Sequence, residues 1–229
     1  MGDAVTVLAL RNVSRSFGPI EVLHGVDIAL RPGQVHALIG ENGAGKSTTM
    51  KIMTGYQPPS SGQVLLDGQP VSFANMGAAE DLGISMIHQE FNLAEQLTVE
   101  QNIFLGRELK RGPFLDKPAM RARTRELLDR LECRVAPDRV VSTLSNSDKQ
   151  MVEIAKALSK KVKLLILDDA HMLRAKQARA RDVLDYVKFL NTMMGERDGT
   201  LVLVGANMEG GPVYEDPQLA ARLRTFALH

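Results

Sequence analysis

A glycine-rich turn between an apolar run and a helix-like segment constrains this chain more than any other stretch of its sequence. The turn, GENGAGKST, follows the apolar run Val35–Ile39 and leads into Lys46–Met53, whose spacing is compatible with a helix. It fits the pattern G-x-x-x-x-G-K-[S/T], in which glycines let backbone N–H groups turn towards phosphate oxygens at a helix N-terminus. The stretch therefore predicts a strand, a phosphate-binding loop and a helix, in that order.

The side chains of this loop predict what it binds. Lys46 would neutralise charge on the β- and γ-phosphates of a nucleotide, and Ser47 would ligate Mg²⁺. An ordinary glycine-rich surface turn would leave the adjacent Lys and Ser unexplained. We therefore expect ATP and Mg²⁺ as cofactors, bound by Gly40, Asn42, Gly43, Ala44, Gly45, Lys46, Ser47 and Thr48.

Length and composition limit the remaining possibilities. The 229 residues, 44% of them hydrophobic, suffice for one large α/β domain or two small ones. No stretch has the eighteen or so consecutive apolar residues of a membrane span, and the N-terminus lacks a signal-peptide pattern, so a cytoplasmic location is expected. The 28 basic and 27 acidic residues nearly cancel, so nucleic acid is not an expected partner. The single cysteine, Cys133, excludes an internal disulfide and a multi-cysteine zinc site.

The sequence around the loop resembles a known family. It is similar to the N-terminal half of ABC-type ATPases over the stretch LRNVSRSFGPIEVLHGVDIALRPGQVHALIGENGAGKSTTMKIMTGYQPPSSGQVLLDGQPV. The end of that stretch, GQVLLDGQPV, predicts an antiparallel hairpin with an Asp-Gly turn. The following segment, GISMIHQEFNLAEQLTVEQNIFLGREL, resembles the ATPase subunits of bacterial monosaccharide importers, such as those for ribose, galactose or xylose.

The resemblance implies further site residues and partners. Phe17 would stack on adenine, with a place in the hydrophobic core as the alternative, and Gln89 would contact Mg²⁺ and the attacking water. A membrane permease subunit and a second ATPase subunit would be the partners, which puts the chain at the inner face of the plasma membrane. In this family the segment after Gln89 is the usual docking place for the membrane partner.

A helical region is expected between Glu100 and Lys163. The phrase DKPAMRARTRELLDRLECRV starts with an Asp-x-Pro signal and places four apolar residues along one helix face: Met120, Leu127, Leu128 and Leu131. The arginines of this helix fit a solvated face better than a nucleic-acid-binding surface.

The next phrase, LSNSD at 144–148, departs from the Leu-Ser-x-Gly-Gln signature that the resemblance implies. Ser145 could still donate a hydrogen bond to the γ-phosphate held by a partner subunit. Ser147 replaces the glycine that permits close approach, and Asp148 brings a carboxylate towards a negatively charged phosphate. Activation across a dimer should therefore be weakened. Because Asn146, Ser147 and Asp148 are good N-cap residues, the following helix should still form.

The strand KLLILDD at 163–169 ends in two acids. Asp168 fits the residue that holds Mg²⁺ through water. Asp169 stands where the family has a glutamate as general base, and a side chain one methylene shorter can cost about a hundredfold in rate. The dimer loop and the histidine that the family carries further on are absent.

Beyond this strand the sequence resembles the second half of AAA+ ATPases that assist DNA transposition. The resemblance rests on LILDDAHML, a helical stretch near Arg181–Met194, and GTLVLVGANMEGGPVYEDPQLAARLRTFALH. It implies Asn207 as an approximate sensor and Arg222 as an arginine finger, with an exposed helix arginine as the alternative. TLVLVG would form a central strand between the two strands of the site, and RTFAL an outer one. A natural recombinant and an engineered or generated hybrid would both look like this chimera.

These patterns lead to one fold and several functions. The expected fold is an α/β P-loop NTPase core with a mostly parallel sheet flanked by helices, an N-terminal antiparallel β-subdomain and a helical subdomain. Residues 1–169 would form the ABC-type region, with the β-subdomain and loop at about 1–90, the helical subdomain at about 91–160 and the acid-bearing strand at 161–169. Residues 170–229 would complete the core sheet.

A weakly hydrolysing ATPase of a carbohydrate importer is the first expectation for function. A non-hydrolysing ATP-binding switch or scaffold is one alternative. An ATP-dependent AAA+ regulator of DNA transposition is another, which the lack of a basic stripe opposes.

Overall fold

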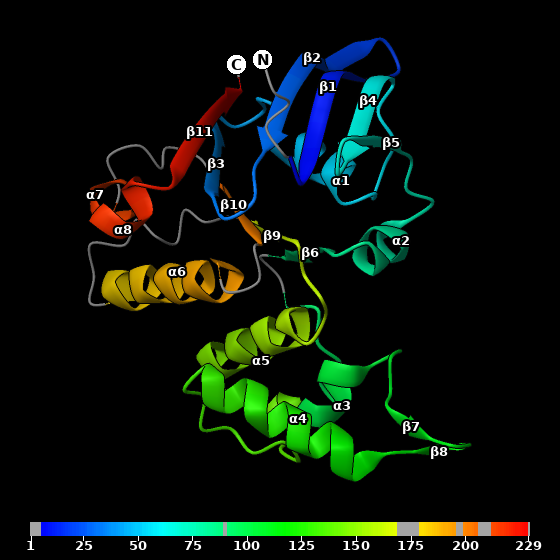
Figure 1. Cartoon of the computed structure of the whole chain (residues 1–229), viewed down its shortest axis with the longest axis vertical. Coiled ribbons are helices and arrows are strands. Elements are labelled where there is room, and N and C mark those ends of the chain that lie inside the picture. The colour runs from blue at the N-terminus through cyan, green and yellow to red at the C-terminus, as the bar shows by residue number, and fades with distance from the viewer. Residues whose placement is uncertain (1–5, 89–90, 169–178, 196–198, 206–211, 229) are drawn as a thin grey trace. The chain divides into compact units, whose positions relative to one another are not determined.

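Two structural units make up the described part of the chain. The computed structural model describes residues 6–88, 91–168, 179–195, 199–205 and 212–228 (Figure 1). One unit combines Met1–Met86 with Val162–His229, and the other is Ile87–Lys161. The first unit holds two sheets of four and five strands, and the second is mainly helical.

A five-stranded sheet forms the centre of the first unit. Its strands are β3 (Val35–Gly40), β6 (Ile84–Ile87), β9 (Leu164–Leu167), β10 (Thr200–Val204) and β11 (Leu223–Leu228), in the order β11-β3-β10-β9-β6. The pairs β11–β3, β3–β10 and β10–β9 are parallel. Every residue of β9 and β10 is buried, which is typical of parallel strands covered on both faces. β10 lies between β3 and β9, and β11 lies outside β3, which are the places expected for TLVLVG and RTFAL.

A four-stranded antiparallel sheet forms the N-terminal part of the same unit. Its strands are β1 (Leu8–Phe17), β2 (Ile20–Leu30), β4 (Ser61–Leu66) and β5 (Gln69–Val71), in the order β2-β1-β4-β5. Asp67 and Gly68, with φ of 48° and 78°, make the turn between β4 and β5. Two successive positive φ angles characterise the tight hairpin turn that the Asp-Gly pair predicts.

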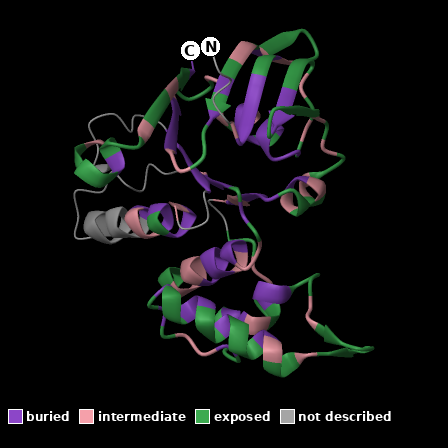
Figure 2. Ribbon diagram, in the orientation of Figure 1, coloured by how far each residue is buried: buried purple, intermediate pink, exposed green. Residues whose placement is uncertain are grey.

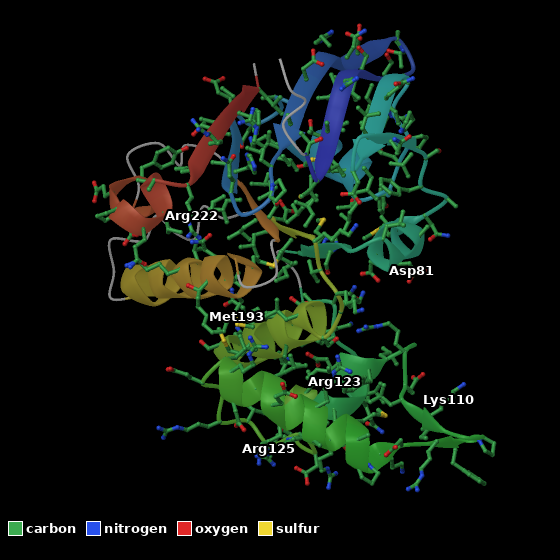
Figure 3. The ribbon with its side chains drawn as sticks, in the orientation of Figure 1. Asp81, Lys110, Arg123, Arg125, Met193 and Arg222 are labelled. Carbon is green, nitrogen blue, oxygen red and sulfur yellow. The ribbon has the colours of Figure 1, made fainter. Side chains whose placement is uncertain are left out.

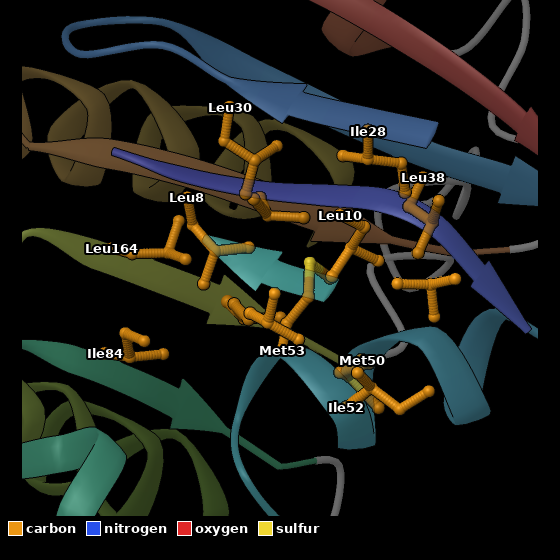
Figure 4. Close-up of a cluster of buried hydrophobic side chains, with 14 of the residues drawn as sticks. Leu8, Leu10, Ile28, Leu30, Leu38, Met50, Ile52, Met53, Ile84 and Leu164 are labelled. Carbon is orange, nitrogen blue, oxygen red and sulfur yellow. The ribbon is translucent and has the colours of Figure 1, made fainter. Parts of the chain in front are cut away.

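One hydrophobic core joins the two sheets of this unit. Leu8 of β1 and Leu30 of β2 belong to the same buried cluster as Leu38 of β3, Leu164 of β9 and Met50 of α1 (Lys46–Met53) (Figure 4). Full burial of one such side chain contributes about 1.5–3 kcal/mol. The helix that follows the glycine-rich loop is therefore fixed by packing as well as by its own hydrogen bonds.

Four further helices lie among the described residues of the first unit: α2 (Met76–Asp81), α6 (Arg179–Gly195), α7 (Pro212–Glu215) and α8 (Pro217–Ala220). The Asp216 carboxylate caps α8 by accepting the N–H groups of Gln218 and Leu219. It also pairs with Lys188 of α6 at 2.5 Å, and the hydrogen bond from Lys188 is the main cause that lowers the pKa of Asp216. Asp216 therefore ties the short helices before β11 to α6.

The second unit is built on three helices, α3 (Val99–Phe104), α4 (Lys117–Arg130) and α5 (Asn146–Leu158), with a 3-10 turn at Val141–Thr143 and a small hairpin of β7 (Lys110–Arg111) and β8 (Phe114–Leu115). Asp116 caps α4, as the Asp-x-Pro signal predicts. The predicted apolar face is confirmed, because Met120, Leu127, Leu128 and Leu131 are all buried. The arginines of α4 are on its exposed side (Figure 2). Among the described helices, none is long and apolar enough to cross a membrane.

Candidate nucleotide-binding site

The predicted phosphate-binding loop connects the end of β3 to the start of α1. Gly45 is the N-cap of α1 and has φ of 87°, a left-handed conformation that favours glycine. A Cβ atom at this position would also collide with the side chain of Leu23. Gly43 has φ of 93°, and a Cβ placed there would meet no atom within 4 Å. The loop is therefore fixed at Gly45 and leaves open space beside Gly43.

The N-terminus of α1 offers hydrogen-bond donors to an anion. Within the described part of the chain no side chain caps this terminus, and its first turn holds no acidic residue. The first N–H groups of a helix have no partner inside the helix, and the helix dipole places about half a positive charge there. This arrangement fits the phosphate groups of a nucleotide.

Lys46 adds a full positive charge at the same place. Its Nζ donates to the backbone oxygen of Gly40 at 2.8 Å and to that of Glu41 at 2.7 Å. These bonds hold the ammonium group back across the loop that precedes it. Because both acceptors are neutral carbonyl groups, the charge is not cancelled by them and remains able to attract phosphate.

A cavity of about 800 Å³ opens beside the loop. Its walls come from the start of β2, from the loop and from the end of β11: Ile20, Glu21, Val22, His24, Ile39, Gly40, Glu41, Asn42, Gly43, Ala44, Ala227 and Leu228. A volume of this size is within the usual range for small-molecule and cofactor sites. Space for a nucleoside therefore adjoins the predicted phosphate site within one structural unit.

Phe17 lies at the end of β1, in the hairpin whose other strand lines the cavity. It pairs with Ile20 across the hairpin, and 46% of its surface is exposed, so it is not a core residue. The Arg15 guanidinium lies 4.9 Å from the centre of its ring. Phe17 is therefore an exposed aromatic ring whose partner across the hairpin, Ile20, lines the cavity.

The strand β9 brings the predicted Mg²⁺-binding acid to the edge of the sheet that carries the loop. Asp168 directly follows β9 and is half-buried, and Gly40 ends the parallel strand β3. Ligands of open parallel sheets bind at the carboxyl ends of the strands. Asp169, Gln89 and Asn207 lie outside the described residues.

In the second unit, the degenerate signature begins a regular helix. Ser145 is the N-cap of α5, and its Oγ accepts the N–H of Asp148 at 3.2 Å. The expectation that residue 146, 147 or 148 would cap this helix is therefore wrong by at least one position. Ser145 caps the helix because its hydroxyl oxygen accepts the N–H of the residue three positions later, which is the usual capping geometry.

Arg222 is exposed in the turn that precedes β11. A Cβ atom at Gly195, the last residue of α6, would lie 3.5 Å from its guanidinium. A cation at a helix C-terminus is stabilised by the helix dipole. Arg222 therefore lies beside the C-terminus of α6 within its own unit.

The outer position of RTFAL is predicted by the sequence, but two details of the structure are not. Ala227 and Leu228 form part of the cavity wall because β11 pairs with β3. In the second unit, the buried carboxylate of Glu153 accepts the N–H of Asn92 at 2.6 Å, and Lys156 Nζ donates to the Asn92 oxygen at 2.8 Å. A Glu within the apolar run of α5 is the sequence signal for such a contact.

The strand, loop, helix and acid-bearing strand at one edge of a parallel sheet define a P-loop nucleotide-binding protein. A family model described as ABC transporter matches residues 23–172. Because this match covers more than half of the chain, the chain belongs to the ABC transporter family, whose ATPase domains bind ATP with Mg²⁺.

Similar proteins carry names of sugar importers. The chain is 48% identical to ribose import ATP-binding protein RbsA 1 of Rubrobacter xylanophilus over 163 residues, which cover 71% of this chain and 33% of that protein. It is 44% identical to galactose/methyl galactoside import ATP-binding protein MglA of Clostridium perfringens, over 74% of this chain and 33% of that protein. The match to RbsA of Chromobacterium violaceum, 41% identical, covers 88% of this chain and 39% of that protein, and so extends into residues 170–229. The chain thus spans about a third of the length of these relatives.

Solved structures of similar fold are ATP-binding cassettes. The structure of cbiO1 from Clostridium perfringens, part of the ABC transporter complex cbiONQ, has a TM-score of 0.75 at 26% identity, covering 92% of this chain and 82% of that one. The structure of MJ1267 has a TM-score of 0.77 at 22% identity, covering 98% of this chain and 88% of that one. The fold is therefore the expected α/β P-loop fold with an antiparallel β-subdomain and a helical subdomain.

Proposed function

We propose that this chain is the ATP- and Mg²⁺-binding domain of a carbohydrate importer ATPase, with weakened hydrolysis. The observation that carries the proposal is the uncapped N-terminus of α1, with Lys46 beside it and a cavity of about 800 Å³ adjoining the loop. The names of the relatives supply the substrate class, a monosaccharide such as ribose or galactose.

The residues predicted to bind ATP and Mg²⁺ each have a part in this proposal. The N–H groups of the loop, Gly40 to Thr48, bind phosphate oxygens, and Lys46 exchanges its two carbonyl acceptors for the phosphates. Phe17 stacks on the adenine at the mouth of the cavity. Ser47, Asp168 and Gln89 would hold Mg²⁺, which would withdraw charge from the phosphates. Asp169 accepts the proton of the attacking water.

Two departures support slow hydrolysis. The base is Asp169 rather than a glutamate, and its side chain is one methylene shorter than in the family pattern. Ser145, which would donate to the phosphate of a partner subunit, instead donates to Asp148. A switch or scaffold that binds ATP without hydrolysing it is the second candidate, and the bond between Ser145 and Asp148 favours it.

The proposed partners follow from the family. A membrane permease subunit and a second ATPase subunit would assemble with the chain at the inner face of the plasma membrane. Residues 1–169 are proposed as the ABC-type region and residues 170–229 as the segment that completes the core sheet through β10 and β11. A hybrid origin of that segment, and a role as AAA+ regulator with Asn207 and Arg222 as sensor and arginine finger, stay predictions without a supporting contact.

Thermal unfolding with and without Mg·ATP tests the nucleotide site. Ligand at a hundredfold above its dissociation constant adds about 2.7 kcal/mol of stability, which raises the melting temperature by several degrees. Lys46→Ala should lose most of this shift, because the phosphates lose their main countercharge. Lys51→Ala, on the exposed side of the same helix, is the matched control and should keep it. An equal shift in Lys46→Ala and the parent would refute the site.

A further inference from the structure

The hairpin β7–β8 carries the most exposed apolar side chain among the large hydrophobic residues that the structure describes. Phe114 is 75% exposed and its neighbour Leu115 is 49% exposed. Figure 1 shows the hairpin extending away from the helices of its unit. Exposed apolar side chains are normal when they occur singly, so two large ones next to each other make this hairpin a candidate interaction site.

The geometry of the hairpin holds these side chains at a defined tip. Lys110 pairs with Leu115, and Arg111 pairs with Phe114. Gly112 has φ of 64° and Pro113 follows it, a combination that suits a two-residue hairpin turn with one positive φ. The N–H of Asp116 donates to the oxygen of Leu109 at 2.7 Å and closes the hairpin at its base.

Each face of the hairpin combines one cation with one apolar side chain. Directly opposite residues of an antiparallel pair project to the same face, and the next pair projects to the other. Lys110 therefore shares a face with Leu115, and Arg111 shares the other face with Phe114. Long basic side chains can place their charge several ångströms from their Cα, so each charge can stay in water while its apolar neighbour is buried.

The chain around the hairpin is basic. Between residues 107 and 126 there are seven Lys and Arg residues and three Asp and Glu residues, although the whole chain has a formal charge of only +1. Arg121 is paired with Glu100 at 2.9 Å, but Lys117, Arg123 and Arg125 are exposed, and Figure 3 shows the last two on α4 with Lys110 at the hairpin. The hairpin and the basic side chains near it can therefore bind anions, and Phe114 and Leu115 can be buried against apolar groups.

We propose that the β7–β8 hairpin docks on an anionic lipid surface. Phe114 and Leu115 enter the boundary between headgroups and acyl chains, and Lys110 and Arg111 contact lipid phosphates. A bilayer boundary takes up apolar side chains and phosphate-binding cations within a few ångströms of each other, which is the combination found on both faces of this hairpin. A nucleic acid would use the charges and leave Phe114 in water. This inference does not rest on the proposed nucleotide-binding function.

Co-sedimentation with lipid vesicles tests the proposal on the full chain without nucleotide. We expect binding to vesicles of phosphatidylcholine mixed equally with phosphatidylglycerol, and at least about tenfold weaker binding to phosphatidylcholine alone. Phe114→Ser should weaken binding to the anionic vesicles about tenfold through lost apolar burial. Lys110→Glu with Arg111→Glu should weaken it by at least about tenfold, and added salt should do the same to the parent.

The matched control removes an exposed aromatic and basic pair from the other unit. Lys51 lies 5.4 Å from the ring centre of Tyr56, and the double variant Lys51→Glu with Tyr56→Ser should keep vesicle binding. Thermal unfolding of each variant ensures that folded protein is compared. The proposal is overturned if the parent does not bind anionic vesicles, or if the control loses binding as much as the hairpin variants. Binding to polyuridylate in place of vesicles would assign the basic residues to nucleic acid and would also overturn it.

Discussion

Ser145 and Asp148 are joined by two hydrogen bonds in the first turn of α5. The Ser145 hydroxyl donates to Asp148 Oδ2 at 2.7 Å, and Ser145 Oγ accepts the Asp148 N–H at 3.2 Å. A hydroxyl hydrogen held by a carboxylate cannot also donate to a phosphate unless that bond breaks. The charge of Asp148 would in addition repel the phosphate. Asp148, which stands in place of the last residue of the signature, therefore holds the hydroxyl hydrogen of Ser145. That hydroxyl is the donor that the departed signature still retains.

Replacing Asp148 should increase ATP hydrolysis through Ser145. The double variant Ser147→Gly with Asp148→Gln removes the carboxylate and restores the glycine. We expect turnover to rise about ten- to a hundredfold, which does not exceed the rate effect of one hydrogen-bond donor to a transition state. The rate should stay below that of a complete importer ATPase, because the dimer loop and the histidine remain absent.

Steady-state phosphate release measures this effect. Adding Ser145→Ala to the double variant should return the rate to that of the parent, since the gain depends on the freed hydroxyl. Asp129→Gln, an exposed acid on α4, is the control for a general charge effect. A gain that persists without the Ser145 hydroxyl would contradict the prediction.

The fold could be predicted where one local pattern decides the structure. The apolar runs of β9 and β10 predict strands of a parallel sheet, and both strands are buried in the structure. The helix expected near Arg181–Met194 is α6. The Asp-x-Pro signal at Asp116 gave the start of α4 because capping depends on neighbours in sequence.

The rest depends on contacts that no local pattern contains. The hairpin β7–β8 has strands of two residues, too short for any periodicity. The cavity beside the loop is lined by residues of both β2 and β11, which are far apart in the sequence, and α7 and α8 are each only four residues long. The loop residues could be predicted from their motif. The bond between Ser145 and Asp148 could not, because several neighbouring residues are suited to cap α5 and the structure shows that Ser145 does so.

Gly45→Ala should destabilise the first unit more than a comparable change elsewhere. The alanine would have to keep the left-handed φ of Gly45, and its Cβ would also collide with Leu23. We therefore expect a loss of about 2–4 kcal/mol in the free energy of unfolding. Gly68→Ala is the matched control, because Gly68 has φ of 78° and open space around it. It should cost about 1 kcal/mol from backbone strain alone. Equal losses in urea unfolding would show that Leu23 does not limit position 45.

Glu153 should stabilise the second unit as a hydrogen-bond acceptor rather than as a charge. Burial raises the pKa of its carboxyl, and the N–H of Asn92 is the largest opposing influence. Glu153→Ala would leave that N–H without its acceptor and should cost about 2 kcal/mol. Glu153→Gln keeps an acceptor and should retain most of the stability. Chemical denaturation at neutral pH compares them, and a loss as large in Glu153→Gln as in Glu153→Ala would assign the effect to the charge.

His36 should make the first unit less stable as the pH falls from about 6.5 to about 4. Its side chain is 1% exposed, its Nε2 accepts the N–H of Arg31 at 3.1 Å, and its ring stacks on Phe226 of β11. The pKa of His36 is lowered from 6.5 to about 4, mainly by burial, and the nearby charges of Arg224 and Arg31 contribute to this lowering.

Proton binding by His36 sets the direction in which the free energy of unfolding changes with pH. Between these two pH values the unfolded chain binds a proton that the folded chain excludes, so acid favours unfolding, and the full effect is about 3 kcal/mol below pH 4. Above pH 6.5 both states are neutral at this residue and the effect vanishes. Urea unfolding of the parent and of His36→Gln across this range isolates the histidine, because the carboxylates of both proteins titrate alike. The difference in free energy between the two should narrow as the pH falls, and a constant difference would mean that His36 is protonated in the folded protein as readily as in the unfolded chain.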